Sequence, residues 1–589
     1  MARRVIARRH RTRATRLARW GVAIAAALAL IVSRARAQDT ARTRVTDTLS
    51  YDDATRIAFL YNQAATIRSR GPVSVDSGQT VDGNVAVLEA PLTVSGHITG
   101  RVVVIDGDVT LHPGARIDGD LIVAGGAAAG ADTTTVGGTI ELRAQRLFYR
   151  MEGEQVVATH DEGRSLISWF RRWRRRHERS ATRFIVKGGT YNRVEGLPIL
   201  FGPVVRSNNP LGPFHMEVMG IYRSADHFAW TKANRGYRAN ADMQFGYRRG
   251  IAIGADAFDD VASAEPWQLH DAEVGLATFM LHRDYRDYYG RTGARGYVSL
   301  RDGPRLSLTL SLGAERWEQR DTRNPFTLFR NDANWRPNPL LDAGRFGLTD
   351  LAVKYDTRND VETPVTGWLI AADIEHGWSN SVTPGPTSPL ARPAASGTLG
   401  VSYTRALMDV RRYNRVSPEG QLNLRLLLGG WVGGDPLPLE RRFSLGGSGT
   451  LPGYDFRQIT AGEDVLTCSD GVEIPGTPAQ CERVALAQME YRHDLNWRLF
   501  GGADLNGWSW GFSHPLQWVL FTDAGRGWLV HRRLDSGTIV RADGIPSLGS
   551  FESDVGIGLD AEVLGIFIAK SLTDSRNPVN FMIRLRHRF

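Results

Sequence analysis

The sequence predicts an all-β protein in which a small parallel β-solenoid precedes an antiparallel transmembrane barrel of about 16 strands. Three observations support this prediction. A glycine-containing pattern recurs between residues 81 and 142, and strand-length segments of alternating apolar and polar residues fill residues 183–589. The composition combines 63 Gly and 15 Trp with two Cys in 589 residues. Such a mixture is typical of many strands and turns rather than of helices or a disulfide scaffold.

The first 37 residues have the pattern of a secretory signal peptide. They contain ten Arg and no acidic residue, and an apolar run from Gly21 to Val32 precedes the small residues Ala35 and Ala37. This order predicts export and cleavage before Gln38. The apolar run of 12 residues is too short to span a bilayer, and an uncleaved anchor is the alternative.

The rest of the chain has a balanced charge. The formal net charge is +9, but outside the leader there are 62 basic and 63 acidic residues. Balanced charge gives the mature protein no electrostatic attraction to nucleic acid, so we expect no nucleic-acid partner. After the leader, the sequence contains no apolar stretch of the length that a membrane-spanning helix needs, which excludes a helical membrane protein.

Residues 73–145 are expected to form the solenoid, after a linker at residues 38–72. Four units that start at Val81, Ile98, Ile117 and Val136 share an aliphatic residue, a glycine and two alternating aliphatic residues. Spacings of 17 and 19 residues suit one coil per unit. The period of two turns one face inward, and glycine permits a tight corner. The stretch resembles the bactofilin-like polymer-forming β-helix, and a stack of antiparallel hairpins is the alternative.

Residues 146–182 are expected to form a basic aromatic linker. Residues 169–176 consist of two Trp, one Phe and five Arg. Aromatic rings and guanidinium groups together are typical of a segment at the membrane surface. A solvated linker is the alternative.

Residues 183–589 are expected to form the barrel. Leucine alternates with small or polar residues from Leu306 to Leu312, and again from Leu422 to Leu428 around Asn423 and Arg425. The apolar face would point to a core in a soluble sandwich and to lipid in a membrane barrel. The predicted strands are centred near residues 198, 219, 229, 242, 255, 277, 298, 310, 352, 372, 402, 424, 488, 519, 557 and 584.

Aromatic residues and the chain end favour the barrel. In the last strand Phe581 and Ile583 lie on one face, and Arg584 and Arg588 lie on the other. Because arginine does not face hydrocarbon, these side chains are expected to face a water-filled lumen. Phe581 and the terminal Phe589 fit the C-terminal assembly signal of outer-membrane barrels. Six aromatic residues are expected in the membrane-interface girdles: Trp508, Trp510, Phe512, Trp518, Phe521 and Trp528.

Four motifs in the same order resemble those of the BamA and TamA superfamily, and the chain is identified as a member of it. Residues 355–367 resemble the DTRD…P…G turn, and residues 443–454 resemble the inward-folded sixth extracellular loop. Residues 490–492 and 521–525 resemble strands 12 and 13 of the family barrel. The resemblance implies an outer-membrane barrel surrounded by lipid and lipopolysaccharide, with its N-terminal domain in the periplasm. It also implies that the barrel assembly machinery takes part in its biogenesis.

One motif position departs from the family pattern. The family loop carries an Arg that pairs with acidic residues inside the lumen, and Pro452 stands at that place. Glu490 and Asp523 are therefore expected to lack their usual partner, unless Arg457 reaches one of them. We expect Tyr454 to pack on the inner wall near Asp523, while a hydrated channel lined by both acids is the alternative. The loop motif as a whole comprises Leu451, Pro452, Gly453, Tyr454 and Arg457.

Cys468 and Cys481, the two cysteines, lie in this same loop. Because an exported protein meets oxidising conditions, we expect them to form a disulfide. Closing a loop of about 15 residues is worth roughly 3 kcal/mol in the chain-entropy model. Two cysteines without a neighbouring histidine do not indicate a metal site.

The sequence predicts no enzymatic activity, cofactor or metal. A nucleophile elbow is incomplete, because Thr450 stands where a second glycine should follow Gly446 and Ser448, and no H-E-x-x-H helix exists. The resemblance implies insertion or translocation of client proteins. However, no POTRA pattern precedes residue 183, so a structural or adhesive surface protein, or a passive pore, is the alternative function.

Overall fold

A computed structural model describes residues 43–46, 49 and most of 51–589. The leader, the aromatic cluster at residues 169–176 and Cys468 lie outside the described residues. Within 51–589 the gaps are at residues 131–134, 144–145, 148, 153–154, 159–180, 210–211, 227–228, 247–248, 303–304, 362, 391–398, 418, 459–477, 496–502, 506–507, 511–515, 534–538, 542–543, 562–563 and 586.

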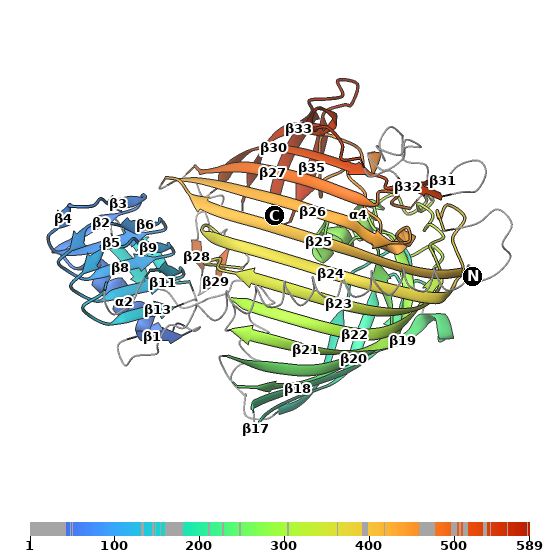
Figure 1. The fold of residues 1–589 in the computed structure, drawn as a ribbon, viewed down its shortest axis with the longest axis horizontal. Helices are drawn as coiled ribbons and strands as arrows, with labels where there is room; N and C mark the ends of the chain where they lie inside the picture. Colours follow the sequence, from blue (N-terminus) through green and yellow to red (C-terminus); the bar gives the residue numbers. More distant parts are fainter. Residues whose placement is uncertain are drawn as a thin grey trace, which may run out of the picture.

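The N-terminal part is a parallel β-solenoid, drawn in blue beside the larger barrel (Figure 1). Its three parallel sheets run in the orders β1-β13-β11-β8-β5-β2, β12-β9-β6-β3 and β10-β7-β4. Val87, Val104, Val123 and Leu142 stack in register from coil to coil inside its apolar core. Parallel pairing confirms the predicted solenoid, and the antiparallel alternative is wrong. The strands are β1 Thr43–Thr46, β2 Thr66–Ser69, β3 Val73–Val75, β4 Thr80–Val81, β5 Asn84–Leu88, β6 Leu92–Val94, β7 His97–Ile98, β8 Val102–Ile105, β9 Val109–Leu111, β10 Arg116–Ile117, β11 Leu121–Ala124, β12 Ala128–Ala129 and β13 Ile140–Arg143.

The repeated glycines are required mainly by close contact between coils. A Cβ atom at Gly100 would lie 2.2 Å from the carbonyl oxygen of Gly83, and a Cβ atom at Gly119 would lie 2.7 Å from the backbone of Gly100. A Cβ atom at Gly138 would lie at the same distance, 2.7 Å, from the backbone carbonyl carbon of Gly119. Of these four residues only Gly83 has a positive φ, +103°. The predicted conformational role therefore holds for Gly83, and the other three leave room for a neighbouring coil.

Residues 38–72 are not simply a linker, which corrects the expectation for this segment. Helix α2 (Tyr51–Asn62) places Ile57 and Tyr61 against the outward side of the six-stranded sheet. The hairpin of β14 (Tyr149–Glu152) and β15 (Gln155–Ala158) covers the same apolar cluster. The apolar residues of α2 recur at the spacing of an amphipathic helix, which a pattern of strand repeats does not reveal.

The barrel is one antiparallel sheet of 16 strands, in sequence order from β16 to β35. Leu310 and Leu312 are 52% and 60% exposed, whereas Ser311 between them is 6% exposed. The apolar face therefore points outward, as in the predicted membrane barrel and unlike a soluble sandwich. The strands are β16 Ala181–Gly188, β17 Pro198–Asn209, β18 Gly212–Arg223, β19 Arg235–Phe245, β20 Arg249–Ser263, β21 Tyr288–Asp302, β22 Leu306–Gln319, β23 Gly344–Asp356, β24 Gly367–Val382, β25 Leu399–Arg415, β26 Gly420–Gly434, β27 Arg483–Asp494, β30 Gln517–Trp528, β33 Glu552–Asp560, β34 Gly565–Ser571 and β35 Asn580–Arg584.

The predicted number of strands is confirmed, but two predicted strands are wrong and two were missed. Residue 229 lies in a loop, and residue 277 lies in helix α4 (Asp271–Leu281). Strands β16 and β34 replace them in the count. A mostly apolar segment as short as α4 does not distinguish strand from helix by pattern alone. The smaller elements are η1 Lys232–Asn234, η2 Leu439–Arg441, β28 Ala503–Leu505, β29 Trp508–Trp510, β31 His531–Arg533, β32 Ile539–Arg541 and η4 Leu548–Ser550.

The barrel has two different ends. At the solenoid end, the turn between β23 and β24 meets the solenoid, because Arg146 donates to Thr363 at 3.4 Å. At the far end, apolar side chains of the strands and of the loop after β26 pack together and fill the lumen. No helix in the described part of the chain has the length and apolar character to cross a membrane. The far-end cluster includes Tyr289, Trp317, Phe346, Tyr403 and Trp431 from strands, with Leu437, Leu439, Phe443, Leu445 and Leu451 from the loop after β26.

We expect Gly119→Ala to destabilise the solenoid by about 1–3 kcal/mol, because the new methyl group has no space between two coils. The exposed His112→Ala is the control and should change stability by less than about 0.5 kcal/mol. The temperature at which protease begins to cut the solenoid of the full-length protein measures both. The same onset for Gly119→Ala and wild type would contradict the close contact.

Candidate functional site in the barrel lumen

The described parts of the long loop between β26 and β27, residues 435–458 and 478–482, fold into the lumen, and the loop tip touches the inner wall. The Gly453 amide donates to Asp554 at 2.7 Å, and Asn580 donates to the Pro452 carbonyl at 3.1 Å. The Tyr454 hydroxyl donates to Glu552 at 2.6 Å. Because Asp554 is directly opposite Asp523 across β30 and β33, the tip lies one strand from Asp523. Leu451 of the same motif is fully buried in the far-end cluster.

Arg457 does not reach Glu490 or Asp523, so that prediction is wrong. Its guanidinium instead binds Glu265 at 3.0 Å and also Asp287. The residue has a φ of +57° in a turn that follows the loop tip. This left-handed conformation reverses the chain and directs the side chain toward the segment between β20 and β21. With 1% of its surface exposed, Arg457 is a buried anchor of the loop.

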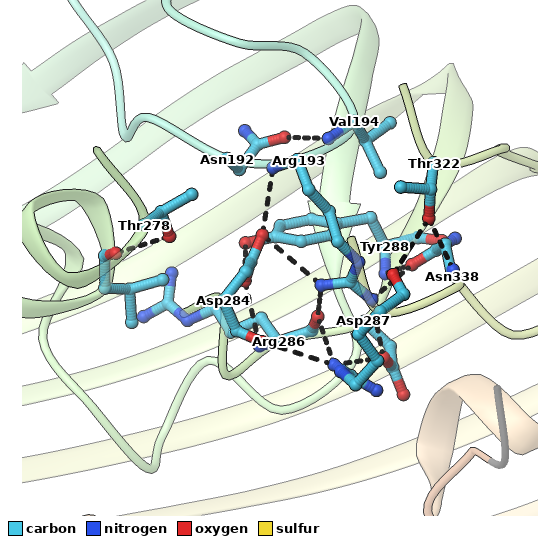
Figure 2. Close-up of polar contacts among 12 residues, drawn as sticks. Asn192, Arg193, Val194, Thr278, Asp284, Arg286, Asp287, Tyr288, Thr322 and Asn338 are labelled. Carbon is cyan, nitrogen blue, oxygen red and sulfur yellow. Dashed lines mark hydrogen bonds and ion pairs between the residues drawn. The ribbon is translucent and has the colours of Figure 1, made fainter. Parts of the chain in front are cut away.

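The Arg457 anchor belongs to a larger network at the far end, which Figure 2 shows around Arg193 and Asp287. Asp287 also binds Arg193 at 3.0 Å and Arg336 at 2.8 Å. The backbone amide of Arg193 donates to Asp284 at 3.0 Å. Burial disfavours the charge of Asp287, but the three arginines together hold its pKa below the usual range. The network thus joins the loop after β16, the loop after β20 and the long lumen loop.

The two lumen acids have partners that the sequence analysis did not identify. Asp523 accepts a hydrogen bond from Arg588, whose guanidinium lies 3.7 Å from the centre of the Phe521 ring. Glu490 accepts from Arg492 at 2.7 Å and is 0% exposed. Both the expected lack of a partner and the hydrated-channel alternative are therefore wrong. The cation beside Asp523 comes from the C-terminal tail rather than from the loop, and its position four residues after Arg584 in the alternating pattern was the available signal.

The C-terminal tail turns into the lumen after β35. Phe581 is 63% exposed on the outer face, as expected, but the strand ends at Arg584. His587 contacts Asp560 at 3.1 Å, and the terminal Phe589 is 8% exposed. The terminal phenylalanine therefore lies inside the barrel and not at the end of the strand. Arg584 faces inward as predicted, although it meets protein partners rather than water.

The expected aromatic girdle is only partly right. Trp518 packs beside Tyr491 with ring centres 5.4 Å apart, on the outer side of the sheet. Phe521 and Trp528 are buried, at 2% and 8% exposure, so they are not girdle residues. The side chains of the other three predicted girdle residues, Trp508, Trp510 and Phe512, lie outside the described part.

Cys481 lies at the base of the lumen loop, where its backbone pairs with that of Phe443. It is fully buried in the far-end cluster. The disulfide with Cys468 stays a prediction, because Cys468 lies outside the described residues. In the part of the chain that the structure describes, no group of three or more His, Cys, Asp or Glu residues could hold a metal ion.

The solenoid end of the barrel carries a second buried network. Arg415 at the end of β25 binds Glu89 of the solenoid at 3.2 Å. Arg146 binds Asp106 at 2.7 Å and Glu89 at 3.3 Å. Burial raises the pKa of Asp106 to about 7 despite the attraction of Arg146, and the nearby Glu89 adds to the rise. The family turn at residues 355–367 thus lies at the contact between solenoid and barrel.

We expect the solenoid to be more stable at pH 5 than at pH 8. A folded-state pKa of about 7 for Asp106 exceeds the unfolded value of about 3.9, so stability falls as the pH rises from about 4 to 7. Asp106→Asn should flatten this dependence. Asp118→Asn is the control, because hydrogen bonds from Arg116 and His97 lower the pKa of Asp118 and its effect falls below that window. Thermal unfolding midpoints at pH 5 and pH 8 measure the pH dependence of stability. If Asp106→Asn kept the wild-type pH dependence, the titrating group would be another residue.

Arg457→Ala should destabilise the barrel by about 3 kcal/mol, because it leaves buried carboxylates of Glu265 and Asp287 short of a cation. Pro452→Arg, which restores the family residue, should not rescue the loss, since Pro452 faces β35 rather than Glu265. The readout is the temperature at which the folded, fast-migrating band disappears on a denaturing gel. Arg588→Ala removes a separate pair, so its loss should add to that of Arg457→Ala. Rescue by Pro452→Arg would contradict this assignment.

Two solved structures and one protein-family model are similar to this chain. The crystal structure of BamA from Haemophilus ducreyi lacking POTRA domains 1-3 is 13% identical over 74% of this chain and 79% of that chain, with a TM-score of 0.41. CdiB from Acinetobacter baumannii is 10% identical over 75% of this chain and 69% of that chain, with a TM-score of 0.29. No curated protein sequence matches. The Omp85 superfamily domain matches residues 260–562, which span the long lumen loop and its acidic wall partners. The chain therefore belongs to the Omp85 superfamily and is an outer-membrane β-barrel protein.

Proposed function

We propose that this protein assists the insertion or translocation of other proteins at the outer membrane, without catalysing a chemical reaction. The observation that carries the proposal is an unpaired edge. In the described chain, each barrel strand pairs with its neighbours in sequence, but β16 and β35 are not paired with each other. We call the junction between these two strands the seam. An unpaired strand edge is a template for a strand of another chain.

The packed lumen supports lateral rather than axial passage. A passive pore needs a water-filled path along its axis, whereas apolar side chains and the Arg457 network fill the far end. A client that entered from the solenoid end would therefore leave through the wall, at the seam. The same packing argues against the passive-pore alternative. A purely structural or adhesive role has no use for an unpaired edge, which exposes the protein to aggregation.

The membrane orientation follows from the strand number. An even number of strands places both ends of the sheet on one side of the membrane, so the solenoid and the C-terminal tail share that side. We assign it to the periplasm, because the leader exports the N-terminal part first. The surroundings are outer-membrane lipid and lipopolysaccharide, and the partners are protein clients. Cleavage before Gln38, the Cys468–Cys481 disulfide and assembly of this barrel through its C-terminal Phe581 and Phe589 belong to the same proposal.

We expect depletion of the protein to lower the abundance of one or more other outer-membrane or surface proteins. Quantitative proteomics of the outer-membrane fraction measures this, and re-expression of the wild-type chain should restore the lost proteins. The purified protein in liposomes should also accelerate the insertion of such a client. An unchanged proteome after depletion would overturn the proposal and favour the structural role.

A further inference from the structure

Helix α4 contacts the end of β35 and the loop that follows β16, the two strands of the seam. It belongs to the loop between β20 and β21, and Figure 1 shows it within the outline of the barrel. On one side, Glu273 receives hydrogen bonds from Arg584 of β35 at 2.7 and 3.2 Å. The backbone amide of Leu585 donates to the same carboxylate at 3.0 Å. One carboxylate of α4 thus holds the end of the last strand.

On its other side, α4 packs against the segment that follows β16. A Cβ atom at Gly275 would lie 3.3 Å from the Tyr191 backbone nitrogen and 3.9 Å from the Thr190 Cα atom. Glycine therefore lets the helix approach this backbone closely. The Phe279 ring meets the Tyr191 ring edge to face, with centres 5.3 Å apart. These contacts are apolar and small, in contrast to the ion pair with β35.

Two leucines of α4 are exposed. Leu276 is 45% exposed on the side opposite to the buried Val274 and Thr278, and Leu281 is 45% exposed at the C-terminal end of the helix. A helix end that faced only water would gain nothing from two exposed leucines, but a helix that fills an opening in a membrane-facing wall would present them to lipid. The position, the contacts and the exposed leucines agree on a place in or directly behind the seam.

We propose that α4 is a movable seal of the seam, held to β35 by the Glu273–Arg584 pair. The inference rests on the proposed function, because a client strand that enters the seam must pass the end of β35 and the loop after β16, which α4 now contacts. The partner that displaces α4 is an extended amphipathic strand, with one apolar face toward lipid. The residues on either side of α4 stay anchored during this movement, since Glu265 before the helix binds Arg457 and Asp287 after it binds Arg193.

A disulfide lock tests the seal directly. The distance between the Gly275 Cβ position and Thr190 suits a disulfide, so Thr190→Cys with Gly275→Cys should fix α4 to the end of β16. The readout is the frequency of conductance openings of the full-length protein in a planar bilayer. The oxidised lock should lose the openings, and reduction should restore them. The two single-cysteine variants and the wild type, treated with the same oxidant and reductant, are the controls.

A charge variant tests whether a weaker contact between α4 and β35 makes the openings more frequent. Glu273→Gln weakens the hold on Arg584 and should raise the opening frequency about tenfold, since charge-assisted hydrogen bonds are the stronger ones. Asp271→Asn is the matched control, because Asp271 lies on the same helix but binds Arg286 at 2.6 Å and not β35. An unaffected lock, or equal openings in Glu273→Gln and Asp271→Asn, would overturn the seal.

Client insertion by the same proteins separates the two proposals. If the wild type inserts clients and the oxidised lock does not, both the function and the seal are supported. If the lock inserts clients as fast as the wild type does, the seal fails and the function stands. If the wild type inserts no client while the lock still abolishes openings, the function fails and the seal stands.

Discussion

The structure depends on one electrostatic constraint: a charge that the barrel turns inward is costly unless a partner lies close by. The outer face is apolar, so charged side chains of the strands point to the interior. The far half of that interior is packed with apolar side chains and offers little water for solvation. Leaving a charge unpaired there costs several kcal/mol. The lumen loop, the loop after β20 and the C-terminal tail all enter the barrel with groups that meet this demand.

The C-terminal tail meets the demand at a structural cost. To bring Arg588 to Asp523, the chain leaves the sheet after Arg584, so the last strand contains five residues. A strand that short offers little edge to β16. The same departure leaves Arg584 beside α4, where Glu273 binds it. The buried pair at Asp523 and the unpaired seam are therefore two results of one turn in the chain.

The solenoid is coupled to the barrel by the same kind of contact. Glu89 of the solenoid binds Arg415 at the end of β25. Arg146, which follows the last solenoid strand, binds Asp106 and Glu89 and donates to Thr363 of the barrel. A solenoid is stiff along its stack because each coil pairs with the next. The Arg415 and Arg146 contacts hold the solenoid at one end of the barrel.

The sequence by itself determined what depends on local period. Alternation of Leu310, Ser311 and Leu312 put apolar and polar side chains on opposite faces, and the glycine repeat set the length of each coil, because neighbouring residues of a strand point to alternate faces. Tertiary structure decided that the apolar face points outward and that the coils pair in parallel. It likewise decided which charges meet. Arg457 lies 192 residues from Glu265, and Arg588 lies 65 residues from Asp523, so no local pattern encodes either pair. It also decided that residues 271–281 form a helix, since Val274 and Thr278 are buried and Phe279 packs against Tyr191 and Phe326 in the folded barrel.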